Sequence, residues 1–213
     1  MSGLVLLGIG TDVGKTFVAY ALIRAMRARG ETVDAFKPVI SGLSAETWPE
    51  SDAGRLLAAL GLPVDQAQLD RIAPFQFRAP LSPPMAARLE GRALVLAEIV
   101  ATCEVRLAET DGLLLIETAG GVMSPIDDDH TMLDLVAALG QPSLLVAGSY
   151  LGAISHTLTA LKALASVGHV PQAIVVSESA GENPPFEETC ADIARLSGVR
   201  VIKAGRGNWD AAL

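Results

Sequence analysis

The most informative part of the chain is residues 4–16, which read Leu4-Val5-Leu6-Leu7-Gly8-Ile9-Gly10-Thr11-Asp12-Val13-Gly14-Lys15-Thr16. It opens with a run that is apolar at every position, as expected of a strand buried on both faces. Glycines between such a strand and a helix let backbone N–H groups approach an anion, and the helix N-terminus adds partial positive charge. The pattern predicts a phosphate-binding loop in which Lys15 reaches the β- and γ-phosphates and the Thr16 hydroxyl binds Mg²⁺.

The spacing of this loop differs from the common form. Five residues separate Gly8 from Gly14, whereas the common form has about four. We interpret this as a loop that is longer by one residue, as in a distinct subclass of these ATPases. No lysine precedes Lys15 within the loop, which argues against the subclass whose second lysine crosses a dimer interface. The alternative is an ordinary strand–helix turn in which Gly14 serves tight packing.

The rest of the chain alternates between short apolar runs and helical patterns. Strands are expected at Leu4–Leu7, Val33–Phe36, Leu113–Ile116, Ser143–Ala147, Ala173–Val176 and Val199–Ile202. Helices are expected at Gly14–Arg29, Leu96–Glu109, Met132–Leu139, Ala153–Val167 and Phe186–Leu196. Because this alternation favours parallel strands with right-handed crossovers, we predict an α/β, three-layer P-loop NTPase-like fold with a mostly parallel central sheet flanked by helices. No repeat, linker or break in composition divides residues 1–213, so we expect a single domain.

Two segments do not fit the alternation. Residues 41–76 have mixed polarity and several prolines, with one helix expected near Ala53–Leu60. Residues 79–94 are also expected to be irregular, since they contain Pro80, Pro83 and Pro84. Long segments of this type in a compact domain are typical of binding loops.

Composition and charge narrow the function classes. The 213 residues are 50% hydrophobic and 19% charged, which indicates a folded core rather than a disordered or fibrous chain. A formal net charge of −8 disfavours non-specific binding to nucleic acid. Cys103 and Cys190 lack the spacing of a disulfide framework or a zinc site. With no signal-peptide pattern and no apolar run of the ~20 residues that a membrane span needs, we expect a cytoplasmic protein without a membrane partner.

Charged residues at or near the predicted strand ends are candidates for chemistry. Lys37 and Glu117 each follow an apolar strand, and the carboxyl ends of parallel strands form the ligand crevice. Mg²⁺ prefers a few hard oxygen ligands, so Thr16, Asp52 and Glu117 suffice together with phosphate oxygens. The alternatives are a solvated lysine for Lys37, a helix cap for Glu117 and an ordinary loop acid for Asp52.

Two helix starts carry weaker signals. The acidic run Asp127–Asp129 precedes Thr131 and a helical pattern, and we expect it to cap that helix rather than to form a second metal site. Gly152, Ala153, Ile154 and Ser155 open another helix without a nearby negative side chain, so its free N–H groups would suit a substrate carboxylate.

Several segments occur in an order that resembles the dethiobiotin synthetase family. They are the loop at residues 8–16, Lys37-Pro38-Val39-Ile40-Ser41-Gly42, Ser51-Asp52, Pro80-Leu81-Ser82-Pro83, Glu117-Thr118-Ala119-Gly120-Gly121 and Leu151-Gly152-Ala153-Ile154-Ser155-His156-Thr157. The loop and the segment that begins at Lys37 are specific individually, and the shared order from residue 8 to about 160 supports the resemblance.

The resemblance implies an ATP-dependent cyclo-ligase that converts 7,8-diaminononanoate and CO₂ to dethiobiotin in biotin biosynthesis. It implies a homodimer in which one subunit's residues 152–155 contact the substrate carboxylate of the other. Catalysis is expected from Lys37 and Lys15, with Mg²⁺ on Thr16, Asp52 and Glu117. The nucleotide is expected to contact Thr11, Asp12, Val13, Gly14, Lys15, Thr16, Phe17, Asp52, Glu117, Thr118, Ala119 and Gly120, and the substrate Lys37, Ser41, Gly152, Ala153, Ile154 and Ser155.

The chain departs from the family at several positions. Ser155 replaces the usual Asn, and Thr118 replaces the usual glycine after the acidic residue. This second change is expected to add bulk beside the nucleotide, but the backbone N–H groups are kept. The Asn that reads adenine is missing at Ser177–Ser179, and residues 204–207 lack the usual proline pattern. ATP remains the expected nucleotide, and relaxed selectivity for the base is a hypothesis.

Three other functions are consistent with the loop. A related ATP-dependent amidoligase usually carries a glutaminase domain, for which this chain has no room. A nucleotide switch of the partitioning type is disfavoured because the second loop lysine and a basic amphipathic tail are missing. A family member that binds nucleotide without catalysis is disfavoured by the intact Lys15, Thr16, Lys37 and Glu117.

Overall fold

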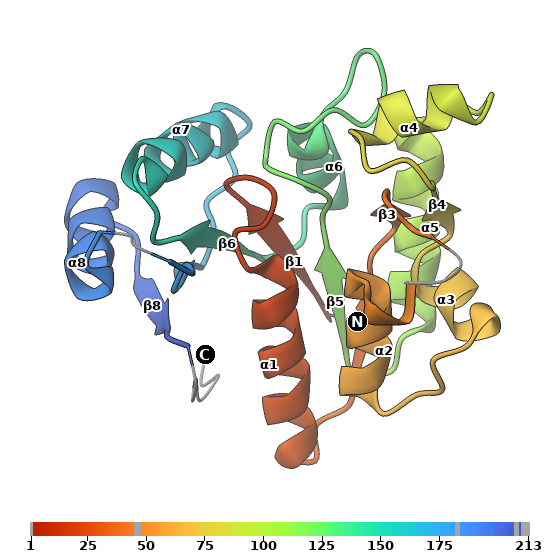
Figure 1. Ribbon diagram of the computed structural model, residues 1–213, viewed down its shortest axis with the longest axis horizontal. Helices are drawn as coiled ribbons and strands as arrows, with labels where there is room; N and C mark the ends of the chain where they lie inside the picture. The colour runs from red at the N-terminus through yellow and green to blue at the C-terminus, as the bar shows by residue number, and fades with distance from the viewer. Residues whose placement is uncertain (1, 45–47, 182–183, 207–208, 210–213) are drawn as a thin grey trace.

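The computed structural model describes residues 2–44, 48–181, 184–206 and 209 (Figure 1). Its centre is a six-stranded, fully parallel sheet in the order β2-β5-β1-β6-β7-β8. The strands are β1 (Ser2–Gly8), β2 (Val33–Phe36), β5 (Leu113–Glu117), β6 (Ser143–Gly148), β7 (Ala173–Ser177) and β8 (Val201–Ala204). All six predicted strands are present, and only the last is shifted, by about two residues along the chain.

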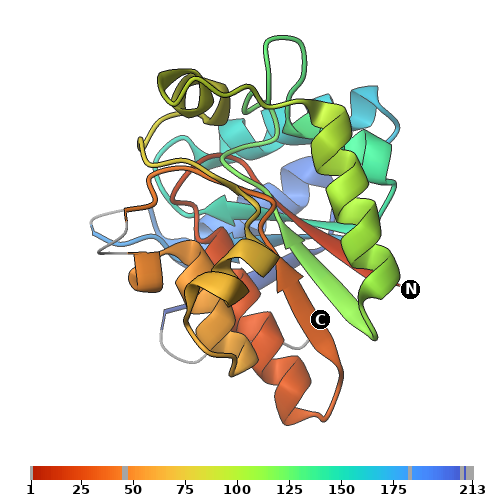
Figure 2. The same ribbon diagram turned by 90° about the vertical axis from the view of Figure 1, so that its right-hand side faces the viewer.

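Helices cover both faces of the sheet, as Figure 2 shows from the side. Leu4 and Leu6 of β1 belong to one apolar core and Val5 and Leu7 to another, as the alternation of side chains along a strand requires. The first core contacts α1 (Lys15–Ala28), α2 (Asp52–Leu60) and α3 (Gln66–Ile72), and the second contacts α5 (Leu96–Glu109), α6 (Met132–Leu139), α7 (Ala153–Ser166) and α8 (Phe186–Ser197). The predicted three-layer α/β fold is therefore confirmed.

The segments predicted to be irregular hold more structure than expected. The helix near residues 53–60 is confirmed as α2, but α3, the 3₁₀ turn η1 (Trp48–Glu50), α4 (Pro83–Leu89) and a small parallel sheet of β3 (Val39–Ile40) with β4 (Phe75–Gln76) were not predicted. The irregular structure predicted for residues 79–94 is wrong in part, because Pro83 and Pro84 open α4. Proline is favourable at a helix start, where its missing N–H would have had no partner.

The acidic run also differs from its predicted role. Helix α6 is capped by Thr131 and Asp134 in a reciprocal capping box. An isolated antiparallel bridge between Pro125 and Thr131 folds the preceding turn back on itself. Asp127 there accepts hydrogen bonds from the backbone N–H groups of Leu96, at the start of α5, and His130. The prediction that the acidic run caps α6 is therefore wrong.

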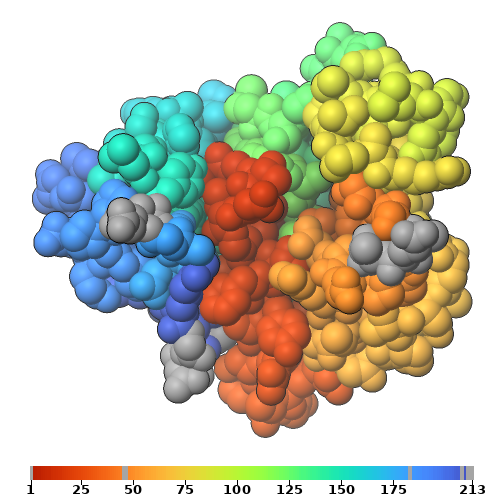
Figure 3. Space-filling model, viewed as in Figure 1, coloured from red at the N-terminus to blue at the C-terminus, as the bar shows by residue number. Residues whose placement is uncertain are grey.

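All parallel strands end at the same edge of the sheet, which gathers Lys37, Glu117 and the phosphate loop there. The space-filling view shows the N-terminal part of the chain, in red, reaching the surface between the C-terminal segments in blue and the orange and yellow residues (Figure 3). Among the described residues, no helix is both long and apolar enough to span a bilayer.

Candidate functional site

The phosphate loop has a backbone shape that only certain residues allow. Gly14 caps α1 with φ 95°, in the left-handed region, and a Cβ at this position would collide with the Ser177 side chain. Asp12 also has a positive φ, of 57°, which Asp tolerates better than most residues. The loop therefore depends on Gly14 for both its conformation and its contact with β7.

Lys15 lies across the inside of the loop. Its Nζ donates hydrogen bonds to the carbonyl oxygens of Gly10 and Gly120, each at 2.8 Å. Gly8 permits this position, since a Cβ there would stand 2.8 Å from the Lys15 Nζ. Burial, assisted by the charge of Lys37, lowers the pKa of Lys15 to about 8.

A buried ionic cluster lies beside the loop, at the ends of β2 and β5. Glu117 is 1% exposed, and its Oε1 accepts hydrogen bonds from the Thr16 hydroxyl at 2.8 Å and from the Lys37 Nζ at 2.6 Å. Asp52, at the start of α2, approaches Lys37 with its Oδ2 at 3.0 Å from the same nitrogen. Lys37 is thus held between two carboxylates from different elements.

The charges within this cluster stabilise one another. Burial alone would lower the pKa of Lys37, but the carboxylates of Glu117 and Asp52 raise it above its ordinary value. Burial alone would raise the pKa of Asp52, but the charge and hydrogen bond of Lys37 hold it below its ordinary value. Lys37 is therefore a protonated cation and Asp52 an anion at neutral pH.

The donor set fits a hard divalent cation. The Glu117 Oε2 is buried and has no hydrogen-bond partner among the described residues. The Thr16 hydroxyl and the Asp52 carboxylate lie next to it in the same hollow. Nowhere in the described part of the chain do three or more His, Cys, Asp or Glu side chains gather as a metal site of their own. The set fits Mg²⁺, which takes few protein ligands and is completed by water and phosphate oxygens.

Most of the predicted site residues line one cleft of about 250 Å³. It is lined by Thr11, Asp12, Gly14, Lys15, Thr16, Phe17, Lys37, Asp52, Arg55, Glu117 and Gly120. Arg55 is the one lining residue that the sequence analysis missed. Its position three residues after Asp52 was an available signal, because that spacing places two side chains on the same face of a helix.

Other predicted residues do not line this cleft. Val13 is a residue of the loop that packs into the apolar core shared with α1, and Ala119 and Ser41 are half-buried. The hydroxyl and the backbone N–H of Thr118 both donate to the Leu6 carbonyl, at 3.0 and 3.1 Å. Thr118 is 1% exposed, so its added bulk points into the protein and not into the cleft, contrary to the expectation.

A second hollow, of about 300 Å³, lies on the other side of the loop. It is lined by Asp12, Val13, Gly14, Phe17, Ser177, Glu178, Ser179, Ala180 and Arg206. The Arg206 backbone N–H donates to the Glu178 carboxylate, and the Ser179 Oγ accepts a hydrogen bond from the Ser149 N–H. Gly207, the last residue of the C-terminal segment that departs from the family pattern, lies outside the described residues.

The start of α7 lies on a separate, open surface. Gly152, Ile154 and Ser155 line a shallow hollow with Leu158, Thr159 and Lys162. Leu151 next to them is 87% exposed. Within one chain, the structure does not bring these predicted substrate-binding residues to the cleft that holds Lys37.

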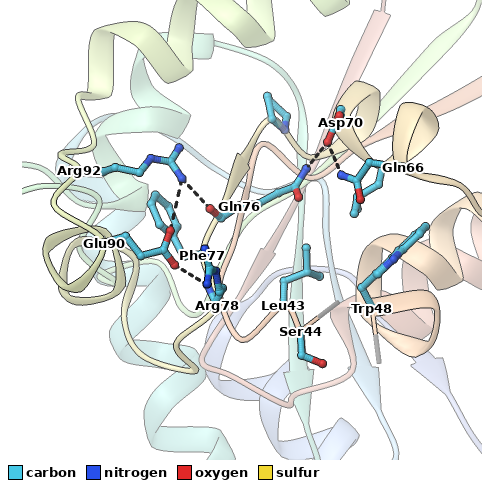
Figure 4. A pocket seen from close by; sticks show the side chains of 12 residues that line it. Leu43, Ser44, Trp48, Gln66, Asp70, Gln76, Phe77, Arg78, Glu90 and Arg92 are labelled. Atoms are coloured by element: carbon cyan, nitrogen blue, oxygen red, sulfur yellow. Dashed lines mark hydrogen bonds and ion pairs between the residues drawn. The ribbon is translucent and has the colours of Figure 1, made fainter. Parts of the chain in front are cut away.

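A further hollow, of about 520 Å³, lies beside α3 and β4 (Figure 4). Its polar groups bind one another. Asp70 accepts hydrogen bonds from Gln66 and Gln76, and Arg92 donates to the Gln76 carbonyl and lies over the Phe77 ring. This hollow contains none of the predicted site residues.

Comparison with known proteins supports the resemblance. A family model described as an AAA domain matches residues 2–206. The chain is 52% identical to an ATP-dependent dethiobiotin synthetase of Caulobacter sp. (strain K31), over 99% of this chain and 91% of that protein. It is 51% identical to an ATP-dependent dethiobiotin synthetase of Phenylobacterium zucineum (strain HLK1), over 100% of this chain and 94% of that protein.

Solved structures with a similar fold are more distant in sequence. The signal recognition particle receptor FtsY from Elizabethkingia anophelis has a TM-score of 0.60 at 15% identity, over 100% of this chain and 61% of that chain. The signal recognition particle 54 kDa protein from Aeropyrum pernix K1, in complex with GDP, has a TM-score of 0.57 at 16% identity, over 99% of this chain and 42% of that chain. At these identities, the likeness shows the fold alone.

Proposed function

The chain belongs to the family of ATP-dependent dethiobiotin synthetases, and from this premise we propose that it converts 7,8-diaminononanoate, CO₂ and ATP to dethiobiotin, ADP and phosphate. The observation that carries the proposal is the cleft in which Lys15, Lys37, Thr16 and Glu117 converge at the carboxyl end of the sheet. A phosphate-binding loop next to a second buried lysine suits a reaction in which an anionic oxygen attacks the terminal phosphorus.

The reaction has three bond-forming steps. One neutral amine of the substrate attacks CO₂ and loses a proton, which gives a carbamate. A carbamate oxygen then attacks the γ-phosphorus, and the bond between the γ-phosphorus and the oxygen it shares with the β-phosphate breaks. ADP departs, and the product of this step is a carbamic–phosphoric anhydride. The second amine attacks the carbonyl carbon, loses a proton and expels phosphate, which closes the ring.

The residues of the cleft meet the demands of these steps. Phosphoryl transfer needs mainly positioning and charge neutralisation. Lys37 would hold the carbamate, and Lys15 and the loop N–H groups would hold the β- and γ-phosphates. Mg²⁺, held by Thr16, Asp52 and Glu117, would neutralise phosphate charge when bound. No covalent protein nucleophile is required.

The substrate tail requires a second copy of the chain in this proposal. Gly152, Ala153, Ile154 and Ser155 lie away from the cleft of their own subunit, next to the exposed Leu151. The Ala153 N–H already donates to the Tyr150 carbonyl at 3.0 Å. A homodimer would bring the other N–H groups at the start of one α7 to the cleft of its partner, where they suit the substrate carboxylate.

The base of the nucleotide would lie in the hollow beside Ser177 and Arg206. The sequence departs from the family there, so we infer turnover with several nucleoside triphosphates at saturating Mg²⁺. A strict preference for ATP would reject this part of the proposal. Cytoplasmic location, one domain over residues 1–213 and no nucleic-acid partner remain predictions.

One assay tests the proposed function directly. The purified chain is incubated with diaminononanoate, bicarbonate, Mg²⁺ and ATP, and dethiobiotin is measured by mass spectrometry. We expect product formation, and ADP release that depends on both the diamine and bicarbonate. ATP hydrolysis that continues unchanged without the diamine would instead support a nucleotide switch.

A further inference from the structure

Arg55 is a cation of the cleft that the proposed reaction does not yet use. It stands on α2, one turn after Asp52, on the face of the helix that borders the cleft. The neighbouring Leu56 and Leu57 are buried in the core, whereas Arg55 is exposed. Within the described part of the chain its side chain has no hydrogen bond or ion pair, so the fold itself does not require the guanidinium.

The charges of the cleft show what Arg55 adds. Its lining contains the carboxylates of Asp12, Asp52 and Glu117 and the cations of Lys15, Lys37 and Arg55. Lys15 is held by two backbone carbonyls, and Lys37 is held by two carboxylates. The guanidinium of Arg55 is therefore the cation of this lining that is not already paired within the described residues.

The position of Arg55 identifies the part of the nucleotide that it reaches. The hollow beside Ser177, on the side expected to hold the base, is not lined by Arg55. Arg55 instead shares the cleft with Lys37 and Glu117, where the terminal phosphate is expected. A guanidinium also matches phosphate oxygens with two parallel N–H donors, which an ammonium cannot do.

We propose that Arg55 binds the γ-phosphoryl group of the nucleotide and stays with it as it moves to the carbamate oxygen. It acts as an arginine supplied from within the same chain, which stabilises the negative charge that develops on the transferring group. This inference rests on the proposed nucleotide site.

Nucleotide affinities test the assignment. Arg55→Gln and Arg55→Lys are compared with the unaltered protein for binding of Mg²⁺ with β,γ-imido-ATP and of Mg²⁺ with ADP, by calorimetry. Because charge-assisted hydrogen bonds to phosphate are lost, we expect Arg55→Gln to lower the affinity for the triphosphate analogue by about 10- to 100-fold. The affinity for ADP should fall by less than about twofold. Arg55→Lys should recover part of the loss. Arg195→Gln, an exposed arginine of α8 outside the cleft, is the control and should change neither affinity.

Two results would overturn the proposal. Equal weakening of both nucleotides would place Arg55 on the α- or β-phosphate, and unchanged affinities would leave it a solvated side chain. Turnover adds a second readout, since kcat should fall in Arg55→Gln even at saturating ATP. If the unaltered protein forms no dethiobiotin, the proposed reaction fails, but the ratio of the two affinities still tests the contact with the γ-phosphate.

Discussion

Two hollows on the same molecule differ in how their polar groups are paired. The hollow beside α3 and β4 is the larger, at about 520 Å³ against about 250 Å³ for the cleft at the phosphate loop. In the larger one, Asp70, Gln76, Glu90 and Arg92 bind one another or the local backbone (Figure 4). In the cleft, an oxygen of Glu117 is buried without a partner among the described residues.

The difference indicates which hollow is built for a ligand. A buried polar atom without a partner costs free energy, so a fold keeps one only where something else compensates for it. In the larger hollow, no buried side-chain nitrogen or oxygen of the described residues lacks a partner. Pairing, rather than volume, therefore separates the proposed active site from a surface hollow that stabilises the fold.

The largest expected effect comes from the lysine of the cleft. Lys37→Ala should lower turnover by about 10²- to 10³-fold, because it removes a cation that acts on the reacting groups. Nucleotide binding should be retained, since the phosphate loop is unchanged. Steady-state rates of dethiobiotin formation and ADP affinity measure the two effects. Unchanged turnover would remove Lys37 from the chemistry.

The carboxylate with the unpaired oxygen is expected to govern metal binding. Glu117→Gln should weaken binding of Mn²⁺ in the presence of ADP by about tenfold or more, since even groups behind the ligands affect metal affinity at this level. Electron paramagnetic resonance of free Mn²⁺ measures this. Glu90→Gln alters a carboxylate of the other hollow and is the matched control. Equal metal affinity in both variants would contradict the assignment of Glu117.

A half-buried ionic cluster should mainly affect stability. Asp34 of β2 accepts two hydrogen bonds from Arg71 of α3 and one from Arg106 of α5. Asp34→Asn should lower the free energy of unfolding by about 2 kcal/mol at neutral pH, because hydrogen bonds to a charged group are lost. Urea denaturation measures this, and turnover at a temperature below unfolding should be unaffected.

The pH dependence of stability tests the same role of Asp34, and its direction follows from the pKa of this carboxyl. Burial alone would raise the pKa of Asp34, but Arg71 and the Ala35 N–H hold it below its ordinary value of 3.8. The contribution of Asp34 is therefore fully present above pH 3.8 and is lost as the pH falls through the lower pKa of the folded state. In the Asp34→Asn variant, the free energy of unfolding should therefore fall less steeply as the pH is lowered through this range. The same acid dependence in both proteins would contradict the interpretation.

The smallest effect is expected at the rim of the paired hollow. Asp70→Asn keeps the shape of the side chain and removes a charge at an exposed position. Its effect on stability should stay within about 0.5 kcal/mol, as for most surface substitutions. Turnover and nucleotide affinity should match those of the unaltered protein. A marked loss of activity in this variant would mean that the larger hollow takes part in function.

Local patterns were enough to predict the main features of the fold and the site. Uninterrupted apolar runs identified the strands, and the glycine loop identified the edge of the sheet at which Lys37 and Glu117 lie. The rest depended on contacts between distant segments. Helices α3 and α4 are short and lie in segments of mixed polarity, and they pack through Leu69, Ile72, Ala86 and Ala87 onto cores that a local pattern does not reveal.

The errors at single residues have similar causes. Thr118 follows Glu117, which lies opposite Leu6 in the sheet, so the backbone there still binds β1 and turns the Thr118 hydroxyl inward. Arg55 is an exception, because its spacing of three residues from Asp52 was a local signal that was not used. Asp127 was assigned to the wrong helix because its partner, Leu96, is distant in the sequence.

The order of the strands sets how far apart the two strands that lead to the lysines of the cleft lie. Lys15 follows β1 and Lys37 follows β2, and β5 with Glu117 lies between them. Neighbouring strands are about 4.8 Å apart, so the two strands that carry the lysines are separated by about 10 Å through backbone hydrogen bonds. The sheet thus fixes the distance between the strand that leads into the phosphate loop and the strand that leads to Lys37. A chain of this fold adapted to a longer or shorter diamine would have to change its loops, because this spacing cannot stretch.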